Sequence, residues 1–337
     1  MRKLSFFDRI VYFLNLILAV TLLLSCLASY ISVKTFLPLA FLSLFFPITV
    51  ILNIPFILYW IYRKKKIFLV SLTAVLISYF LFGSFYKFGS ANVSLADKDL
   101  SIMTFNTRDF SFKGRAKSEL TGKEIIDFII DQDPDIVCFQ EFARGGVKQL
   151  KKYPFNYITP YSSQKSIQAI FSKYPIVGNG SLEFPNTLNN ALYADILYKS
   201  DTIRVYNIHF QSFKVIPSRI KRIGRGLRVY GKMKYAFLKQ EEQVQLFVKH
   251  RKESPFRTII CSDFNNTSFS NVYRIAKGEM NDTFDKKGSG FGKTFDLKFV
   301  PFRIDFILTY KTMDVMTHQK FDLTLSDHYP VKTSIRL

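Results

Sequence analysis

The sequence predicts an α/β fold in which two β-sheets pack together with helices on their outer faces, preceded by three transmembrane helices. Two observations lead to this prediction. Roughly the first 90 residues are almost continuously apolar, as in membrane-spanning segments. The rest of the chain holds many short apolar or alternating runs, typical of strands, and few stretches with helical spacing. Packing sheet on sheet with helices outside would bury these apolar faces.

Three apolar stretches make up the N-terminal part: Ile10–Val33, Phe36–Ile61 and Ile67–Phe85. A helix of about 20 residues crosses a hydrocarbon core of roughly 30 Å. Basic residues precede the first stretch and fill the connection at 63–66, so the positive-inside rule places the N-terminus in the cytoplasm. Three crossings then put the remaining chain on the extracytoplasmic side of an inner or plasma membrane. Prolines in the second stretch leave open a re-entrant hairpin, which would invert this topology.

The composition changes near residue 90, which suggests a membrane anchor over 1–90, a linker over 91–99 and a soluble domain over 100–337. The part after residue 90 holds 38 of the 47 basic and 25 of the 26 acidic residues, about +13 of the net charge of +21. Such a charge implies a polyanionic partner or an anionic surface. The three cysteines fall in apolar runs, so we expect buried thiols and no disulfide framework. No internal repeat is visible.

The elements of the soluble domain follow from the apolar periodicity. We expect helices over Gly122–Asp131 and Tyr235–His250, where apolar residues recur with helical spacing. Short apolar or alternating runs predict strands over Leu100–Asn106, Asp135–Phe139, Ala169–Phe171, Ala191–Tyr198, Ile203–Ile208, Arg257–Cys261, Phe302–Thr309 and Val331–Ile335.

Polar residues gather at the ends of these strands: Asn106, Arg108, Glu141, His209, Asp263, Asn265, Asp305, Asp327 and His328. A carboxylate at a strand end, such as Asp263, can activate water, and the amide of Asn265, two residues on, can hold a phosphoryl oxygen. The alternative is an Asx-rich turn after a strand. Likewise, His209 could be a hydrogen-bonded core histidine and Arg108 a surface charge.

Hard oxygen ligands suggest a metal site. Glu141 and Asp327, with Asn106 nearby, suit Mg²⁺ or Mn²⁺, whereas no Cys/His pairs occur at zinc spacing. Asp305 and His328 could form an acid–imidazole pair in which the carboxylate fixes the ring tautomer.

The motifs TFNTR, DPDIVCFQE, FSKYPI, NIHFQS, SDFNN, RIDFIL and SDHYPV, in this order, resemble the endonuclease/exonuclease/phosphatase superfamily. This superfamily includes DNase I-like nucleases, AP endonucleases, neutral sphingomyelinases and inositol polyphosphate 5-phosphatases. The resemblance covers about residues 100–337. It implies a four-layer α/β sandwich that hydrolyses phosphoester bonds with Mg²⁺.

The resemblance also implies roles for single residues. Glu141 would be the main metal ligand, with Asn106 beside it, and Asp327 would help to hold this metal or a second one. Asp263 would orient or deprotonate the attacking water, while Asn265 would bind the phosphate. The remaining pair, His328 with Asp305, would contact the phosphoryl group and stabilise its developing charge.

Two further positions bear on the branch of the family. His209 would be the acid for the leaving oxygen, but the sequence offers it no convincing carboxylate partner, because Gln168 stands where an acid would be expected. Arg108 would contact phosphate, which argues against the AP endonucleases, since these carry an acid there. Ser262 replaces the glycine that begins the family's GDFN motif, and the functional side chains follow it unchanged.

A basic stretch between Lys214 and Lys234 bears on the substrate, because it holds eight Lys or Arg residues and no acid. It could bind nucleic acid phosphates or an anionic bilayer, or be a solvated loop. The sequence thus predicts a membrane-anchored phosphodiesterase of the nuclease type. Alternatives are a phosphodiesterase or phosphatase acting on phospholipid head groups, and an inactive, membrane-anchored phosphate-binding domain. The sequence implies no protein partner.

Overall fold

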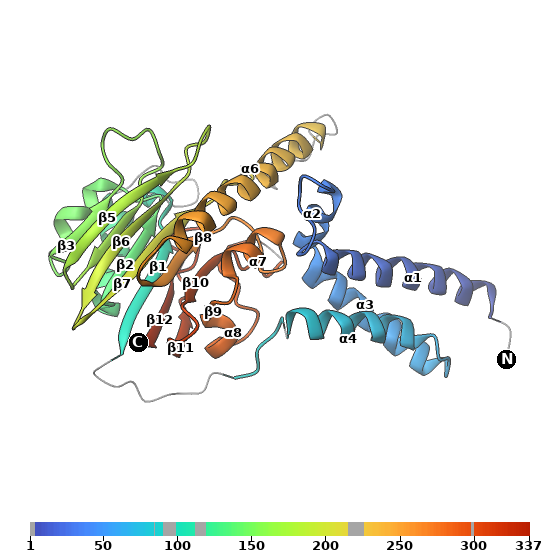
Figure 1. Ribbon diagram of the computed structural model, residues 1–337. Helices are drawn as coiled ribbons and strands as arrows, with labels where there is room; N and C mark the ends of the chain where they lie inside the picture. The colour runs from blue at the N-terminus through green and yellow to red at the C-terminus, as the bar shows by residue number, and fades with distance from the viewer. Residues whose placement is uncertain (1–3, 84, 90–98, 112–118, 215–225, 298–299) are drawn as a thin grey trace. The chain divides into compact units, whose positions relative to one another are not determined.

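The computed structural model describes residues 4–83, 85–89, 99–111, 119–214, 226–297 and 300–337 (Figure 1). The chain forms two compact units. The helical unit comprises Met1–Phe85 and Thr267–Arg274, and the sheet unit comprises Tyr86–Asn266 and Ile275–Leu337. Most of the linker expected over 91–99, and residues 215–225 of the basic stretch, lie outside the described residues.

The helical unit is built from α1 (Phe6–Leu27), α2 (Leu37–Leu44), α3 (Phe46–Tyr62) and α4 (Phe68–Phe82). A buried polar chain joins three of these helices. The amide of Asn15 donates to the Ser71 hydroxyl at 2.7 Å, and this hydroxyl donates to Asn53 Oδ1 at 2.6 Å. Between apolar helices such bonds favour one packing arrangement, because an unpaired polar group there is costly.

The prediction of three transmembrane helices is wrong. Among the described residues, α1 alone is long and apolar enough to cross a membrane, and α2 with α3 qualifies only if a pair bent by 67° counts as one span. With 15 residues, α4 reaches about 22 Å, less than the roughly 30 Å of a hydrocarbon core. The second apolar stretch breaks at Phe45, and α3 restarts with a proline in its first turn, where the missing N–H does no harm. Counting apolar residues does not detect this break.

The sheet unit contains two six-stranded mixed sheets, with strand orders β11-β12-β1-β2-β4-β3 and β5-β6-β7-β8-β10-β9. The strands are β1 (Leu100–Asn106), β2 (Ile136–Gln140), β3 (Phe155–Ile158), β4 (Ala169–Ser172), β5 (Ile176–Glu183), β6 (Asn190–Tyr198), β7 (Asp201–His209), β8 (Arg257–Asp263), β9 (Asn281–Asp282), β10 (Asp305–Thr309), β11 (Asp314–Lys320) and β12 (Val331–Arg336). The helices are α5 (Glu119–Gln132), α6 (Gly226–Lys252) and α8 (Thr283–Lys287), together with 3₁₀ turns η1 (Arg108–Phe110) and η2 (Arg144–Gln149). A further helix, α7 (Asn271–Lys277), begins in the helical unit and ends in the sheet unit. The predicted pair of mixed sheets flanked by helices is therefore confirmed.

The alternation of side chains along the strands builds the layers. In β1, Ile102 packs into the core between the sheets, whereas Met103 and Phe105 pack on the outer face with residues of α5. On the other sheet, Phe247 of α6 contacts the ring of Tyr206 from β7. The three cysteines are buried free thiols, as expected.

The two sheets share one topology. Among the described strands each has a single parallel pair, β1 with β2 and β7 with β8, and α5 and α6 lie in the respective crossover connections. The strands of the first sheet, taken in the order β11, β12, β1, β2, β3, β4, correspond one by one to β5, β6, β7, β8, β9 and β10 of the second. Corresponding strands pair with corresponding neighbours, in the same parallel or antiparallel sense. By this register, Gln168, just before β4, corresponds to Asp305 at the start of β10.

Candidate active site

Polar residues from both sheets meet at the carboxyl ends of the two parallel pairs. Asn106 ends β1 and Glu141 follows β2, while His209 ends β7 and Asp263 ends β8. Strands that run parallel end at the same edge of a sheet, so each pair presents two side chains there. Asp305 joins them because β10 runs antiparallel to β8 and begins directly opposite Asp263.

The backbone turns sharply at three of the sequence-predicted residues. Arg108, Glu141 and Asn265 have positive φ angles of 48°, 47° and 50°. Residues other than glycine rarely adopt this conformation, and where it occurs the surrounding structure must hold it. In each case the turn lies within two residues of the end of a strand, and it redirects the chain out of the sheet.

Asp263 is the centre of the cluster and is fully buried. Its Oδ2 accepts a hydrogen bond from the Asn106 amide at 2.9 Å, and its Oδ1 accepts the backbone N–H of Asn265 at 2.8 Å. The Nε2 atoms of His209 and His328 each lie 3.7 Å from Oδ2. Burial raises the pKa of Asp263 to about 6, although the positive charge of His328 acts in the opposite direction.

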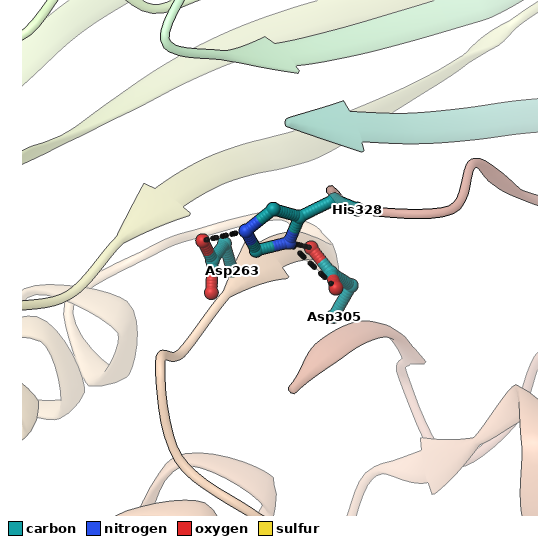
Figure 2. Close-up of side chains that lie close together, drawn as sticks. All are labelled: Asp263, Asp305 and His328. Atoms are coloured by element: carbon teal, nitrogen blue, oxygen red, sulfur yellow. Dashed lines mark hydrogen bonds and ion pairs between the residues drawn. The ribbon is translucent and has the colours of Figure 1, made fainter. Parts of the chain in front are cut away.

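Asp305 and His328 form the predicted acid–imidazole contact (Figure 2). The Nδ1 of His328 lies 3.1 Å from each oxygen of the Asp305 carboxylate, and its other nitrogen faces Asp263. Burial alone would lower the pKa of His328, but the two carboxylates raise it to about 10. At neutral pH the ring is therefore an imidazolium whose two N–H groups are directed at these carboxylates.

Glu141, Asp327 and Arg108 lie at the edge of the cluster. The Glu141 side chain is 35% exposed, with Oε1 3.6 Å from His209 Nε2. Burial raises the pKa of Glu141, His328 lowers it, and the negative charge of Asp327 raises it further. The Arg108 guanidinium donates to Asp327 Oδ2 at 2.8 Å, and the Arg108 backbone N–H donates to Asn106 Oδ1 at 3.0 Å. Arg108 is thus bound within the cluster.

His209 is buried, and among the described residues neither of its ring nitrogens has a hydrogen-bond partner. Glu141 and Asp263 are its nearest acids, 3.6 and 3.7 Å from Nε2. Gln168, at the position where the sequence lacks an acid, donates to the backbone oxygen of Asn190 at 2.7 Å and also to its side-chain oxygen. Burial lowers the pKa of His209, whereas the negative charge of Asp263 acts in the opposite direction.

Sequence reasoning missed two residues that position the cluster. The Thr294 hydroxyl accepts the backbone N–H of Asp305 at 3.0 Å and so fixes the start of β10. The Ser326 hydroxyl donates to the backbone oxygen of Asn106 at 2.9 Å, which links the segment before β12 to the end of β1. Ser326 begins the SDH motif and could have been found there, whereas nothing in the sequence around Thr294 marks it.

The family model described as "Endonuclease/Exonuclease/phosphatase family" matches residues 103–328. The chain belongs to this family. A domain family of unknown function matches residues 8–85, and no curated protein matches the chain.

Solved structures show the same fold at low sequence identity. An endonuclease/exonuclease/phosphatase from Bacteroides vulgatus is 19% identical with a TM-score of 0.54, covering 71% of this chain and 99% of that chain. TDP2 from D. rerio, complexed with a single-strand DNA product, is 15% identical with a TM-score of 0.54, covering 72% and 100%. The mannosyl-6-phosphatase Bt3783 from Bacteroides thetaiotaomicron is 17% identical with a TM-score of 0.50, covering 71% and 100%.

Members of the endonuclease/exonuclease/phosphatase family are hydrolases that act on phosphoester bonds and typically use a divalent metal. The side chains here fit such a metal. The negative charge of Asp327 raises the pKa of Glu141, so the two carboxylates repel each other. A divalent cation held by both would relieve this repulsion. Asp263, Asp305 and His328 form a second group whose ligand atoms lie within 4.8 Å of one another, and a metal bound there would have to displace a ring proton of His328.

Proposed function

We propose that this chain is a membrane-anchored, metal-dependent phosphodiesterase of the endonuclease type, which uses Mg²⁺ or Mn²⁺. The observation that supports this most strongly is the burial of Asp263 among polar groups from both sheets. A fully buried carboxylate that contacts an amide, a backbone N–H and two imidazoles is expensive to assemble for stability alone. Titratable side chains that lie close together and have shifted pKa values are typical of active sites.

Asp263 is proposed to take the proton of the attacking water. Asn106 and the backbone N–H of Asn265 each hold one of its oxygens, so the carboxylate keeps a fixed direction. Its pKa of about 6 leaves it mostly ionised at neutral pH, yet basic enough to accept a proton. The side chain of Asn265 is proposed to bind the phosphate with the second N–H of its amide, because Nδ2 also donates to the Phe210 backbone oxygen at 3.0 Å, which fixes its position.

His328 is proposed to donate a hydrogen bond to a phosphoryl oxygen from Nε2, because the 3.7 Å between this atom and Asp263 Oδ2 is longer than a hydrogen bond. The carboxylate of Asp305 keeps its ring charged and oriented, so charge that develops on phosphorus-bound oxygen meets a fixed donor. Arg108 is proposed to add a second positive group at the same oxygens. Its guanidinium is 43% exposed and within the cluster, and it can exchange its contact with Asp327 for phosphate.

Glu141, Asn106 and Asp327 are proposed to hold the metal. When bound, a divalent ion supplies Lewis acid polarisation of the phosphoryl oxygen. His209 is proposed to give a proton to the leaving oxygen. Burial lowers its pKa and Asp263 raises it, so an acid role depends on the two nearby carboxylates.

The membrane assignment is proposed from α1, the single helix among the described residues that meets the length and hydropathy criteria alone. With α1 crossing once and its basic N-terminal flank in the cytoplasm, the sheet unit would be extracytoplasmic. The native cysteines are all buried, so a cysteine introduced at exposed Lys311 can be labelled selectively. A membrane-impermeant maleimide should label Lys311→Cys in intact cells, and labelling only after lysis would place the domain in the cytoplasm.

A lipid head-group phosphodiesterase or phosphatase is the second candidate, because α1 would hold the site next to a bilayer. The test uses the full-length chain in detergent with Mg²⁺ or Mn²⁺. Plasmid DNA, RNA, phosphatidylinositol or sphingomyelin vesicles and soluble inositol phosphates are offered in parallel. Asp263→Asn and EDTA should each abolish hydrolysis. As a matched control, Asp195→Asn alters a buried acid on β6 that pairs with Arg204, and it should retain activity.

Cleavage of DNA or RNA that needs both Asp263 and the metal supports the nuclease candidate. Turnover restricted to vesicles supports the lipid candidate. Hydrolysis that persists in Asp263→Asn would refute the assignment of the site.

A further inference from the structure

The N-terminal part of α6 projects beyond the sheet on which the rest of the helix packs (Figure 1). The sequence predicts this helix only from Tyr235, yet it begins at Gly226, and its first buried residue is Ala236. We call residues 226–235 the α6 extension. At about 1.5 Å per residue it amounts to roughly 15 Å of helix with no buried side chain.

Apolar and basic side chains are interleaved along the α6 extension. Leu227 is 87% exposed and Tyr230 is 48% exposed, and their spacing of three residues places them on one side of the helix. Arg228 and Lys232, four residues apart, lie together on another side. Residues 226–235 include no acid, and Lys234 adds a third basic residue.

This pattern does not stabilise the isolated helix. The N-terminus of a helix carries a partial positive charge and favours acidic side chains, but the first turn of α6 has none. Basic residues there increase the positive potential, and Leu227 presents its side chain to water. Both features would be favourable if the α6 extension faced a surface that is anionic and has an apolar layer beneath its charges.

We propose that the α6 extension binds the surface of an anionic lipid bilayer, an inference that rests on the proposed membrane anchoring. Leu227 and Tyr230 would enter the boundary between head groups and acyl chains, while Arg228 and Lys232 meet lipid phosphates. A nucleic acid strand would satisfy the charges but would offer little to an exposed leucine, so the bilayer is the better match.

This contact would also orient the site. Beyond the extension, the Gln240 side chain of α6 donates to the backbone oxygens of Gln211 at 2.7 Å and Asn265 at 3.2 Å. Its side-chain oxygen accepts the amide of Asn266 at 2.8 Å. The same helix therefore holds the turns that follow His209 and Asp263, and a bilayer bound at one end of α6 would fix how these turns face the membrane.

The test places a polarity-sensitive fluorophore on the α6 extension of the full-length chain in liposomes. Leu227→Cys is labelled with NBD, since the three native cysteines are buried. The matched control is Leu246→Cys, which is 42% exposed and lies in the second half of the same helix. Liposomes contain either phosphatidylcholine alone or phosphatidylcholine with phosphatidylglycerol, each with a doxyl-labelled lipid as quencher.

We expect NBD emission at position 227 to be quenched at least twofold more in phosphatidylglycerol liposomes than in phosphatidylcholine ones, with no such difference at position 246. Arg228→Glu with Lys232→Glu should remove the difference. Equal quenching in both lipids, or a response at position 227 only to single-stranded DNA, would overturn the proposal. Flotation of the chain with liposomes tests the membrane anchoring, and hydrolysis of bis-p-nitrophenyl phosphate tests the proposed activity. Either proposal can therefore fail independently of the contact made by the α6 extension.

Discussion

Replacing Asp305 by Asn tests whether the buried acid–imidazole pair supports chemistry or only stability. In the structure both carboxylate oxygens lie 3.1 Å from His328 Nδ1. An asparagine keeps one acceptor, replaces the other with an N–H₂ group and removes the negative charge. The backbone contact with Thr294 is unaffected, because it uses the N–H of residue 305.

The magnitude follows from these contacts. A hydrogen bond to a charged group contributes about 1.5 to 3 kcal/mol, and removing one partner of a buried pair costs roughly 3 to 5 kcal/mol. If about 3 kcal/mol of this is lost from the transition state, kcat falls by roughly 10²-fold, since about 1.4 kcal/mol corresponds to tenfold. KM should change little, because Asp305 acts through His328 and does not reach the substrate.

The assay follows hydrolysis of bis-p-nitrophenyl phosphate by the full-length chain in detergent with Mg²⁺, across a range of pH. In the native chain the pKa of His328 is raised to about 10, so the charged ring persists well into the alkaline range. The variant should lose activity at a lower pH, because its ring loses a proton earlier. Asp195→Asn, the matched buried acid, should lower thermal stability but keep kcat and the alkaline limb. An Asp305→Asn enzyme with kcat within about threefold of native and the same alkaline limb would refute this reasoning.

Three further predictions concern the metal, the helical unit and the effect of pH on stability. Glu141→Gln should raise the Mg²⁺ concentration for half-maximal activity at least about tenfold, as seen by titration, because a ligand charge is lost. Ser71→Ala should destabilise the helical unit by about 1 to 2 kcal/mol in detergent unfolding, because Asn15 and Asn53 lose their buried link. Burial lowers the pKa of His318 to about 4, so between about pH 6.5 and 4 the unfolded chain binds a proton that the folded chain does not. The free energy of unfolding should therefore decrease as the pH is lowered from about 6.5 to 4, by at most about 3 kcal/mol. His318→Gln should flatten the dependence of the melting temperature on pH.

Each of these has a result that contradicts it. An unchanged Mg²⁺ requirement would remove Glu141 from the metal site. Ser78 donates to the Val75 backbone oxygen of its own helix, so Ser78→Ala is the control for Ser71→Ala. Equal effects of the two substitutions would show that the bonds between helices add no stability of their own. Parallel pH profiles for the native chain and His318→Gln would show that this histidine does not titrate on unfolding.

The strand end at Asn106 was predictable because the alternation of β1 stops there. An apolar or β-branched run followed by a polar residue marks a strand end. For Asn106 this signal coincides with the observed bound, whereas β8 continues two residues beyond the predicted Arg257–Cys261 and ends at Asp263. The contact between Asp305 and His328 could be anticipated only through the family resemblance, since 22 residues separate them in the chain and no local rule joins β10 to the segment before β12.

Other features depend on information that periodicity does not contain. The break between α2 and α3 and the short length of α4 are set by backbone geometry within continuous apolar sequence. Strand β11 carries polar residues on a partly exposed edge, so it has no apolar pattern to detect. The surroundings of His209 were not predictable either, because its nearest acids come from the ends of β2 and β8.

The shared topology of the two sheets has a consequence for how such a site can originate. Asp305 has Gln168 as its counterpart, and Gln168 donates to Asn190 at the start of β6, as His328 beside β12 donates to Asp305. Each pair joins the two sheets, and one consists of two neutral amides whereas the other consists of an acid and an imidazolium. The fold thus accepts a hydrogen-bonded pair at either of these two positions. Exchanging uncharged for ionisable side chains would turn a structural pair into one that can take part in catalysis. A duplicated ancestor could acquire its chemistry in this way without any change of backbone.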